Sequence, residues 1–194
     1  MVRIHLSMWQ WAVLPMLLTS VPYQIAPTPG THLTLEVFKS GLWSGRKHSF
    51  TFDRFKGSLS YDAQAPERSQ VRFTVDAKSI ALHDAWVSEK DRPKIVKFAL
   101  DDMLQADRHP ELEFSSTRIT AAGPGRFQVL GSLTMRGVAK PVTVDVTLKP
   151  DLTVEGTATL KMTDWGMKPP SAALGTIGTR DEMKVSFVVK PAAH

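Results

Sequence analysis

The sequence predicts a mostly β fold: a single antiparallel β-barrel of about eight strands with one amphipathic helix at its side or end. Three observations support this prediction. Apolar and polar residues alternate through most of the chain with the period of two that is typical of strands with one buried face. One central segment has helical periodicity instead. The 194 residues suffice for one domain with a substantial core and a short appendage.

The first expected strands precede the helix. Apolar residues alternate with polar ones in Leu33–Val37, in Phe50–Phe52 and in Val71–Val75, and Gly57–Tyr61 adds a shorter piece. An open sheet of this length would expose its edge strands to pairing with other chains. Closure into a barrel is therefore favoured.

The helix is predicted over Ser88 to Gln105. Ser88 can cap its first turn, and Pro93 is tolerated early in a helix. Ile95, Phe98 and Ala99 recur at helical spacing and form an apolar stripe. We expect this stripe to cover one end of the barrel.

Strands resume after the helix, and the most regular pair is a long hairpin. Leu112 and Phe114 form the first strand of this half of the chain. In the hairpin, apolar residues occupy alternate positions of both strands and so share one face. They are Phe127, Val129, Leu133, Met135, Val142, Val144, Val146 and Leu148. Residues 136–141 separate the two arms. Leu152–Met162 and Met183–Val189 complete the expected sheet.

The first 26 residues differ from the rest of the chain. Arg3 precedes the apolar run Met8–Leu18, which is too short to span a membrane as a helix, and the proline-rich Pro27–Gly30 follows. This order predicts a secretory leader over residues 1–26, a β domain over residues 27–194 and a periplasmic or secreted location. An N-terminal membrane or packing segment is the alternative.

The composition excludes several classes of function. The chain has no cysteine, so it is neither a disulfide scaffold nor an enzyme with a thiol nucleophile, and it has no cysteine zinc site. The net charge is +5, but the 24 basic residues are spread among 19 acidic ones. Such a dispersed charge is more typical of a solvated surface than of a nucleic-acid site.

The sequence also lacks the usual motifs of catalysis. The six histidines show no paired metal spacing, and Gly41–Gly45 places its serine one position away from a nucleophile elbow. Gly175–Gly178 is too short to be a phosphate-binding loop. We therefore expect no catalytic residue, no metal and no cofactor, and a protein that is not an enzyme.

Several motifs in a fixed order resemble a known family. They are Ser40–Trp43 with His48, Phe55–Gly57 with Tyr61–Asp62, Val71–Asp76 leading into Ser79–Ile80, Pro110–Thr117, Gly131–Val142, Thr163–Gly166 and Asp181–Met183. In this order and spacing the chain resembles the YceI-like family of exported lipid- or polyisoprenoid-binding proteins. The resemblance spans about Leu33 to Val189. It implies a lipocalin-like antiparallel barrel with a helix at its side and a long apolar tunnel that holds an isoprenoid or acyl chain.

Ten apolar residues are the candidates for the lining of this tunnel. They share the inward parity of their strands and are Phe50, Phe52, Phe73, Phe114, Phe127, Leu133, Met135, Val144, Val146 and Phe187. The alternative is that these side chains simply fill a core, because buried aromatic residues are usually structural.

Four residues near turns or strand ends are candidates for the rim of the tunnel. They are Trp43, His48, Asp164 and Arg180. Rim residues would contact the head group of a ligand. The alternative is that they are surface or capping residues, and that Arg180 forms an exposed ion pair of little energetic worth with Asp181.

The hypothesis from the sequence is an exported binding or carrier protein that holds an isoprenoid, a quinone tail or a fatty acyl chain. The expected partner is a hydrophobic small molecule or lipid and not a nucleic acid, while transient membrane contact and a homodimer stay open. One alternative is a barrel with a filled core that acts in protein interaction or stress protection. Another is an enzyme acting on isoprenoids, which would need a reactive polar cluster inside the barrel.

Overall fold

The computed structural model describes residues 20–172 and 176–193. Its strands are β1 (Val21–Ile25), β2 (His32–Gly41), β3 (Lys47–Phe52), β4 (Phe55–Tyr61), β5 (Gln70–Asp76), β6 (Ile80–Leu82), β7 (Glu111–Gly123), β8 (Arg126–Met135), β9 (Val138–Leu148), β10 (Val154–Lys161), β11 (Ser171–Ala172), β12 (Ile177–Val189) and β13 (Ala192–Ala193). The helical elements are α1 (Arg92–Phe98), the π-helix η3 (Ala99–Leu104) and the 3₁₀ turns η1 (Pro66–Arg68), η2 (Ala77–Ser79) and η4 (Met162–Trp165).

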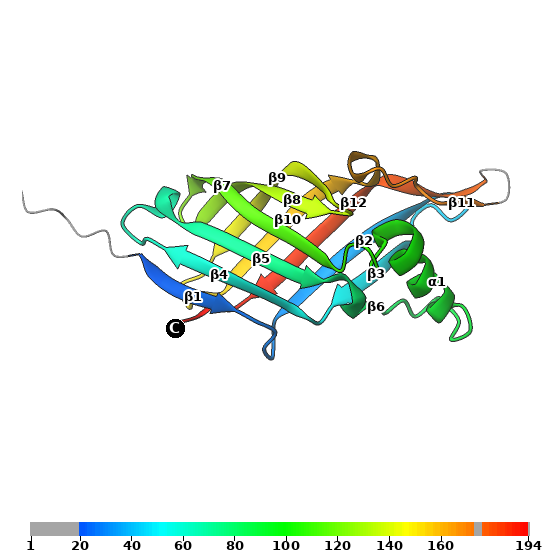
Figure 1. Cartoon of the computed structure of the whole chain (residues 1–194), viewed down its shortest axis with the longest axis horizontal. Helices are drawn as coiled ribbons and strands as arrows, with labels where there is room; N and C mark the ends of the chain where they lie inside the picture. Colours follow the sequence, from blue (N-terminus) through cyan, green and yellow to red (C-terminus); the bar gives the residue numbers. More distant parts are fainter. Residues whose placement is uncertain (1–19, 173–175, 194) are drawn as a thin grey trace, which may run out of the picture.

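The strands form one antiparallel sheet that curls around a common interior. The order is β13-β1-β4-β5-β7-β8-β9-β10-β12-β2-β3-β6, and β11 pairs with β12 beside this path. Figure 1 shows β4, β5 and β7 in front of β10 and β12, with α1 at one end of the long axis. The prediction of a mostly β, antiparallel fold with one helix is confirmed, whereas the expected closed barrel is instead a curled half-barrel with β13 and β6 at the two ends of its strand order.

The expected number of about eight strands is too low, because the chain bends between β3 and β4 and between β5 and β6 and forms separate strands there. Only Asp53 and Arg54 separate β3 from β4, and only the turn η2 separates β5 from β6. β3 pairs with β6, and β4 pairs with β5, so the two bent segments stay side by side along their length. Alternation of apolar residues marks each half of such a segment but gives no sign of the bend. The short strands β1, β11 and β13 raise the number further.

Strand β1 lies within the residues that we assigned to a leader. It pairs with β4 and with β13, and Ile25 is buried in the core. The sheet therefore begins before residue 27, where we expected the β domain to start. Residues 1–19 of the expected leader lie outside the described residues, and export stays a prediction.

The side chains of the β8–β9 hairpin face the predicted sides of the sheet, but the turn between the strands is shorter than expected. Arg136 and Gly137 alone connect the strands, and both have positive φ angles, of 54° and 73°. This conformation matches the type I′ turn that suits the twist of a hairpin. Residues 138–141, which we expected in the turn, instead continue the pairing, as Thr134 with Ala139 and Ser132 with Pro141.

The helical segment starts later than predicted. Residues 88–91 form a turn in which the Ser88 hydroxyl donates to Asp91 Oδ2 at 2.7 Å and accepts from the Asp91 amide at 3.2 Å. Helix α1 then begins at Arg92 and passes into η3, which ends where Gln105 adopts a left-handed φ of 51°. None of the helices in the described ranges has the length and apolar character needed to cross a membrane.

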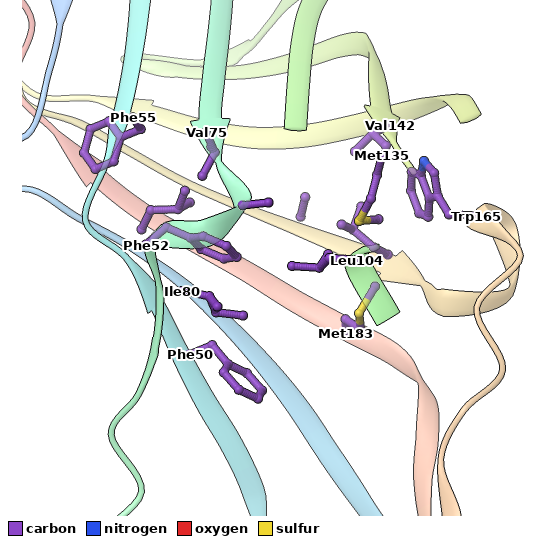
Figure 2. Close-up of a cluster of buried hydrophobic side chains, with 14 of the residues drawn as sticks. Phe50, Phe52, Phe55, Val75, Ile80, Leu104, Met135, Val142, Trp165 and Met183 are labelled. Carbon is purple, nitrogen blue, oxygen red and sulfur yellow. The ribbon is translucent and has the colours of Figure 1, made fainter. Parts of the chain in front are cut away.

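A cluster of buried apolar side chains holds the helical segment against the sheet. Leu104, from the end of η3, lies close to Met135 of β8 and Met183 of β12 (Figure 2). Phe52 and Ile80, which are paired across β3 and β6, extend the cluster toward the bend in the sheet. This packing holds the end of the helical segment against the sheet, but of the predicted stripe only Ala99 is buried, Ile95 is half-buried and Phe98 is exposed.

Candidate ligand cavity

The interior of the sheet contains a cavity of about 490 Å³. This volume falls within the roughly 300–1,000 Å³ of small-molecule sites. Along β12 the wall extends from Thr179 to Val189, which corresponds to roughly 30 Å of strand. Most of the wall is aliphatic, aromatic or methionine side chain. A long, narrow, apolar ligand matches these dimensions.

All ten residues proposed as tunnel lining lie on the wall of this cavity. Four of them are buried, namely Phe50, Phe52, Met135 and Val144. The other six are half-buried and are Phe73, Phe114, Phe127, Leu133, Val146 and Phe187. The alternating pattern therefore identified which side chains face the interior. Their contact with a ligand stays a prediction.

The half-buried residues show that the interior is not filled. Phe127 on β8 and Val146 on β9 are directly opposite each other in the hairpin, and both face inward. In a packed protein core such side chains would touch neighbours on all sides and lose almost all of their exposed surface. Here part of their surface faces the cavity. This observation argues against the filled-core alternative.

Glycines in the wall let three phenylalanine rings lie close to neighbouring strands. A Cβ atom on Gly156 would lie 2.2 Å from Cζ of Phe187, and one on Gly131 would lie 2.3 Å from Cζ of Phe114. Phe73 lies over Gly57 in the same way, at 2.9 Å. Because a ring needs such a gap to approach the backbone, these glycines keep aromatic rings out of the centre of the cavity.

The four residues proposed as rim separate into two groups. Trp43 lies in the turn between β2 and β3 and packs edge-on against Trp86, with ring centroids 5.9 Å apart. The His48 ring stacks on Trp86, with ring centroids 4.9 Å apart, and His48 lies on the cavity wall. Asp164 in η4 and Arg180 in β12 are exposed, and neither is on the wall.

His48 is buried together with Asp84, a residue that the sequence did not single out. Nδ1 of His48 lies 2.5 Å from Oδ2 of Asp84, and the other carboxylate oxygen accepts from the Ser49 amide at 2.9 Å. A carboxylate can only accept, so the Nδ1 of His48 carries the hydrogen. Burial lowers the pKa of His48 below its usual range, although the hydrogen bond to Asp84 opposes this shift. His48 is therefore a neutral, fixed imidazole near pH 7.

Lys39 is a second polar residue near His48 that the sequence analysis did not single out. It lies on the cavity wall and is half-buried. The signal was present in the sequence, because Lys39 continues the inward parity of Leu33, Leu35 and Val37. Asp84 gave no comparable signal, since it follows a three-residue strand in an irregular loop and reaches His48 only through the fold.

Cationic and aromatic side chains lie together on the surface next to His48 and Lys39. The Arg46 guanidinium lies 5.2 Å from the ring centroid of Trp86 and 5.8 Å from that of Trp43. The Lys39 ammonium lies 5.9 Å from the Trp43 ring. Cations at these distances are attracted by the electron-rich faces of the rings. The β2–β3 turn and the loop before α1 are held together by these contacts.

No metal site is evident in residues 20–172 and 176–193, where no three His, Asp or Glu side chains gather. The His48–Asp84 pair resembles the base and the orienting carboxylate of catalytic sites. A third member is not in place, because no hydroxyl of the described residues forms a hydrogen bond with Nε2 of His48.

Comparisons with known proteins agree with the geometry. A family model described as the YceI-like domain matches residues 23–190. A UPF0312 protein of Pseudomonas putida is 33% identical over 136 residues, which cover 66% of this chain and 67% of that protein. A UPF0312 protein of Azotobacter vinelandii is 35% identical over 94 residues, covering 48% of this chain and 45% of that protein.

Solved structures with the same architecture have lower sequence identity. BcnA of Burkholderia cenocepacia matches 83% of this chain and 96% of its own, with a TM-score of 0.66 and 22% identity. A polyisoprenoid binding domain from Saccharophagus degradans matches 91% of this chain and all of its own, with a TM-score of 0.60 and 12% identity. The YceI protein of Campylobacter jejuni matches 75% and 84%, with a TM-score of 0.54 and 16% identity. At these identities the likeness shows the fold.

Proposed function

Because the chain belongs to the family of YceI-like domains, we propose that it is an exported carrier that binds one apolar chain inside its sheet. The ligand is an isoprenoid, a quinone tail or a fatty acyl chain. The observation that carries this proposal is the set of inward-facing, half-buried side chains around a cavity of about 490 Å³. The domain from Saccharophagus degradans, described as polyisoprenoid-binding, supports the ligand class.

Burial of an apolar chain supplies enough free energy for stable binding. Each buried methylene contributes roughly 0.8 kcal/mol, so about ten of them contribute roughly 8 kcal/mol before the cost of ordering the ligand. Apolar contacts have little directionality. The wall therefore selects for length and girth of the chain, and any chemical selectivity depends on the few polar residues at the ends of the cavity.

Two neighbouring positions on β9 give a sharp test of this proposal. Val146 faces the cavity and is half-buried, whereas Thr147 is the next residue and is exposed on the outer face. We expect Val146→Trp to occupy the cavity and to weaken binding of farnesol to delipidated protein by at least about tenfold. Thr147→Trp adds the same side chain outside and should leave the dissociation constant unchanged.

Fluorescence or calorimetric titration measures both variants, and circular dichroism checks that each is folded. Equal binding by the two variants and the unchanged protein would mean that the ligand lies elsewhere. Failure of the unchanged protein to bind farnesol, ubiquinone or a fatty acid would refute the carrier function altogether.

A further inference from the structure

The side chains on the cavity wall that carry a basic nitrogen come from three elements. They are Lys39 on β2, His48 on β3 and Lys94 on α1, and the wall contains no aspartate or glutamate. Lys94 already has a partner, because its ammonium lies 2.9 Å from Oδ1 of Asp91. The basic residues of this largely apolar cavity thus come from α1, β2 and β3.

The ammonium of Lys39 has no acidic partner within ion-pair distance among residues 20–172 and 176–193. Asp84 acts on Lys39 only at longer range, since its two carboxylate oxygens are bound to His48 and Ser49. Burial lowers the pKa of Lys39, and the charge of Asp84 raises it by less. A half-buried cation is costly when it lacks a counter-charge, so an anion on the ligand would stabilise it.

His48 lies beside Lys39 on the same face of the sheet. Val37 is paired with His48, and Lys39 is two residues further along the same strand. Such diagonal positions are about 7–8 Å apart, within reach of a single head group. Thr179 of β12 lies directly opposite Lys39 and also lies on the wall. Three polar side chains from three neighbouring strands therefore converge on one end of the cavity.

We propose that Lys39, with the Thr179 hydroxyl beside it, forms the head-group site for an anionic amphiphile, a ligand whose apolar chain fills the cavity and whose terminal carboxylate or phosphate contacts the Lys39 ammonium. This proposal rests on the carrier function proposed above and adds the charge of the ligand. The opposite end of the cavity, near Tyr61 and Ser69, has hydroxyl groups and no cation on its wall. The head group is therefore oriented toward α1.

Matched pairs of probes test this proposal. Palmitate is compared with hexadecanol, and farnesyl phosphate with farnesol, so that each pair shares its apolar chain and differs in its charge. We expect the protein to bind at least one anion roughly tenfold more tightly than its alcohol. The anion with the larger preference identifies the carboxylate or the phosphate as the natural head group.

Three variants assign the preference to Lys39. Lys39→Met keeps an unbranched side chain of similar length, and it should abolish the preference for the anion while binding of the alcohol is kept. Lys39→Arg keeps the charge and should keep the preference. Lys184→Met removes an exposed lysine from the outer face of β12 and should change neither affinity.

Equal affinity of the unchanged protein for anion and alcohol would overturn the head-group site but leave the carrier function standing. Persistence of the preference in Lys39→Met would also overturn it. Failure to bind any of the four probes or ubiquinone would overturn the carrier function itself, and the head-group site with it.

Discussion

Individual side chains on the cavity wall divide into those that are buried by packing and those that are only half-buried. Phe52 and Met135 are buried and hold the helical segment, whereas Phe127 and Val146 are half-buried although they point inward. This difference cannot be read from hydropathy, because both kinds have the same alternating pattern. Substitutions at the two kinds of position should therefore have different effects, on stability for the first and on ligand binding for the second.

The ionisation of His48 makes the free energy of unfolding depend on pH. Its pKa in the folded protein is held below its ordinary value, mainly by burial and further by the charge of Lys39, while Asp84 opposes the shift. The unfolded chain therefore binds a proton more readily than the folded one, with a pKa near the usual value of about 6.5. The stability that comes from His48 is fully present above that pH and is lost as the pH falls through the folded value.

The variant His48→Asn tests this prediction, because its amide can donate to Asp84 but does not titrate. Thermal or urea unfolding of the two proteins is compared from pH 8 to pH 5. We expect the free-energy advantage of the unchanged protein to shrink as the pH falls below about 6.5. An advantage that stays constant or grows on acidification would show that the pKa of His48 is not lowered.

At the level of strands, the sequence predicted which way the side chains face but not where the strands bend. The alternating pattern predicted the facing of β8 and β9 residue by residue, because one face is buried and a shift by one residue would reverse it. The bends between β3 and β4 and between β5 and β6 were missed, since two or three residues of irregular backbone leave no periodic signal. Strand β1 was missed because its sequence, with Pro22 inside it, looked like the end of a leader.

A glycine in β10 controls how far one ring enters the cavity. The three heavy atoms nearest to a Cβ atom on Gly156 would all belong to the Phe187 ring, at 2.2 to 2.9 Å. We expect Gly156→Ala to force the Phe187 ring inward, to lower stability by about 1–3 kcal/mol and to weaken ligand binding. Urea unfolding and titration with the same apolar probe measure the two effects.

A second substitution distinguishes the ring from the backbone as the cause. Gly156→Ala combined with Phe187→Leu should recover binding, because the smaller side chain leaves room for the new methyl group. Thr157→Ala, on the outer face of the same strand, serves as the control and should bind normally. Weak binding by the double variant would place the effect in the strand rather than in the ring.

The whole molecule is a curled sheet around an apolar space, with its basic end next to the helix. The sequence predicted the family, the antiparallel sheet and the residues that face the interior. It could not show whether those side chains fill the interior or leave a cavity, because the cavity depends on the curvature of the sheet and on gaps such as those at Gly131 and Gly156. The contact of Asp84 with His48 was likewise hidden, since the two residues come from separate segments of the chain.

The central claim is that this space holds a ligand, and native mass spectrometry tests it most directly. The protein is purified without detergent, its intact mass is recorded under native conditions, and the bound material is extracted and identified. We predict an adduct with the mass of one isoprenoid, quinone or acyl lipid in the unchanged protein and in Thr147→Trp, and little or none in Val146→Trp. A protein that carries no apolar molecule, and that takes up no added isoprenoid quinone after purification, would contradict the claim.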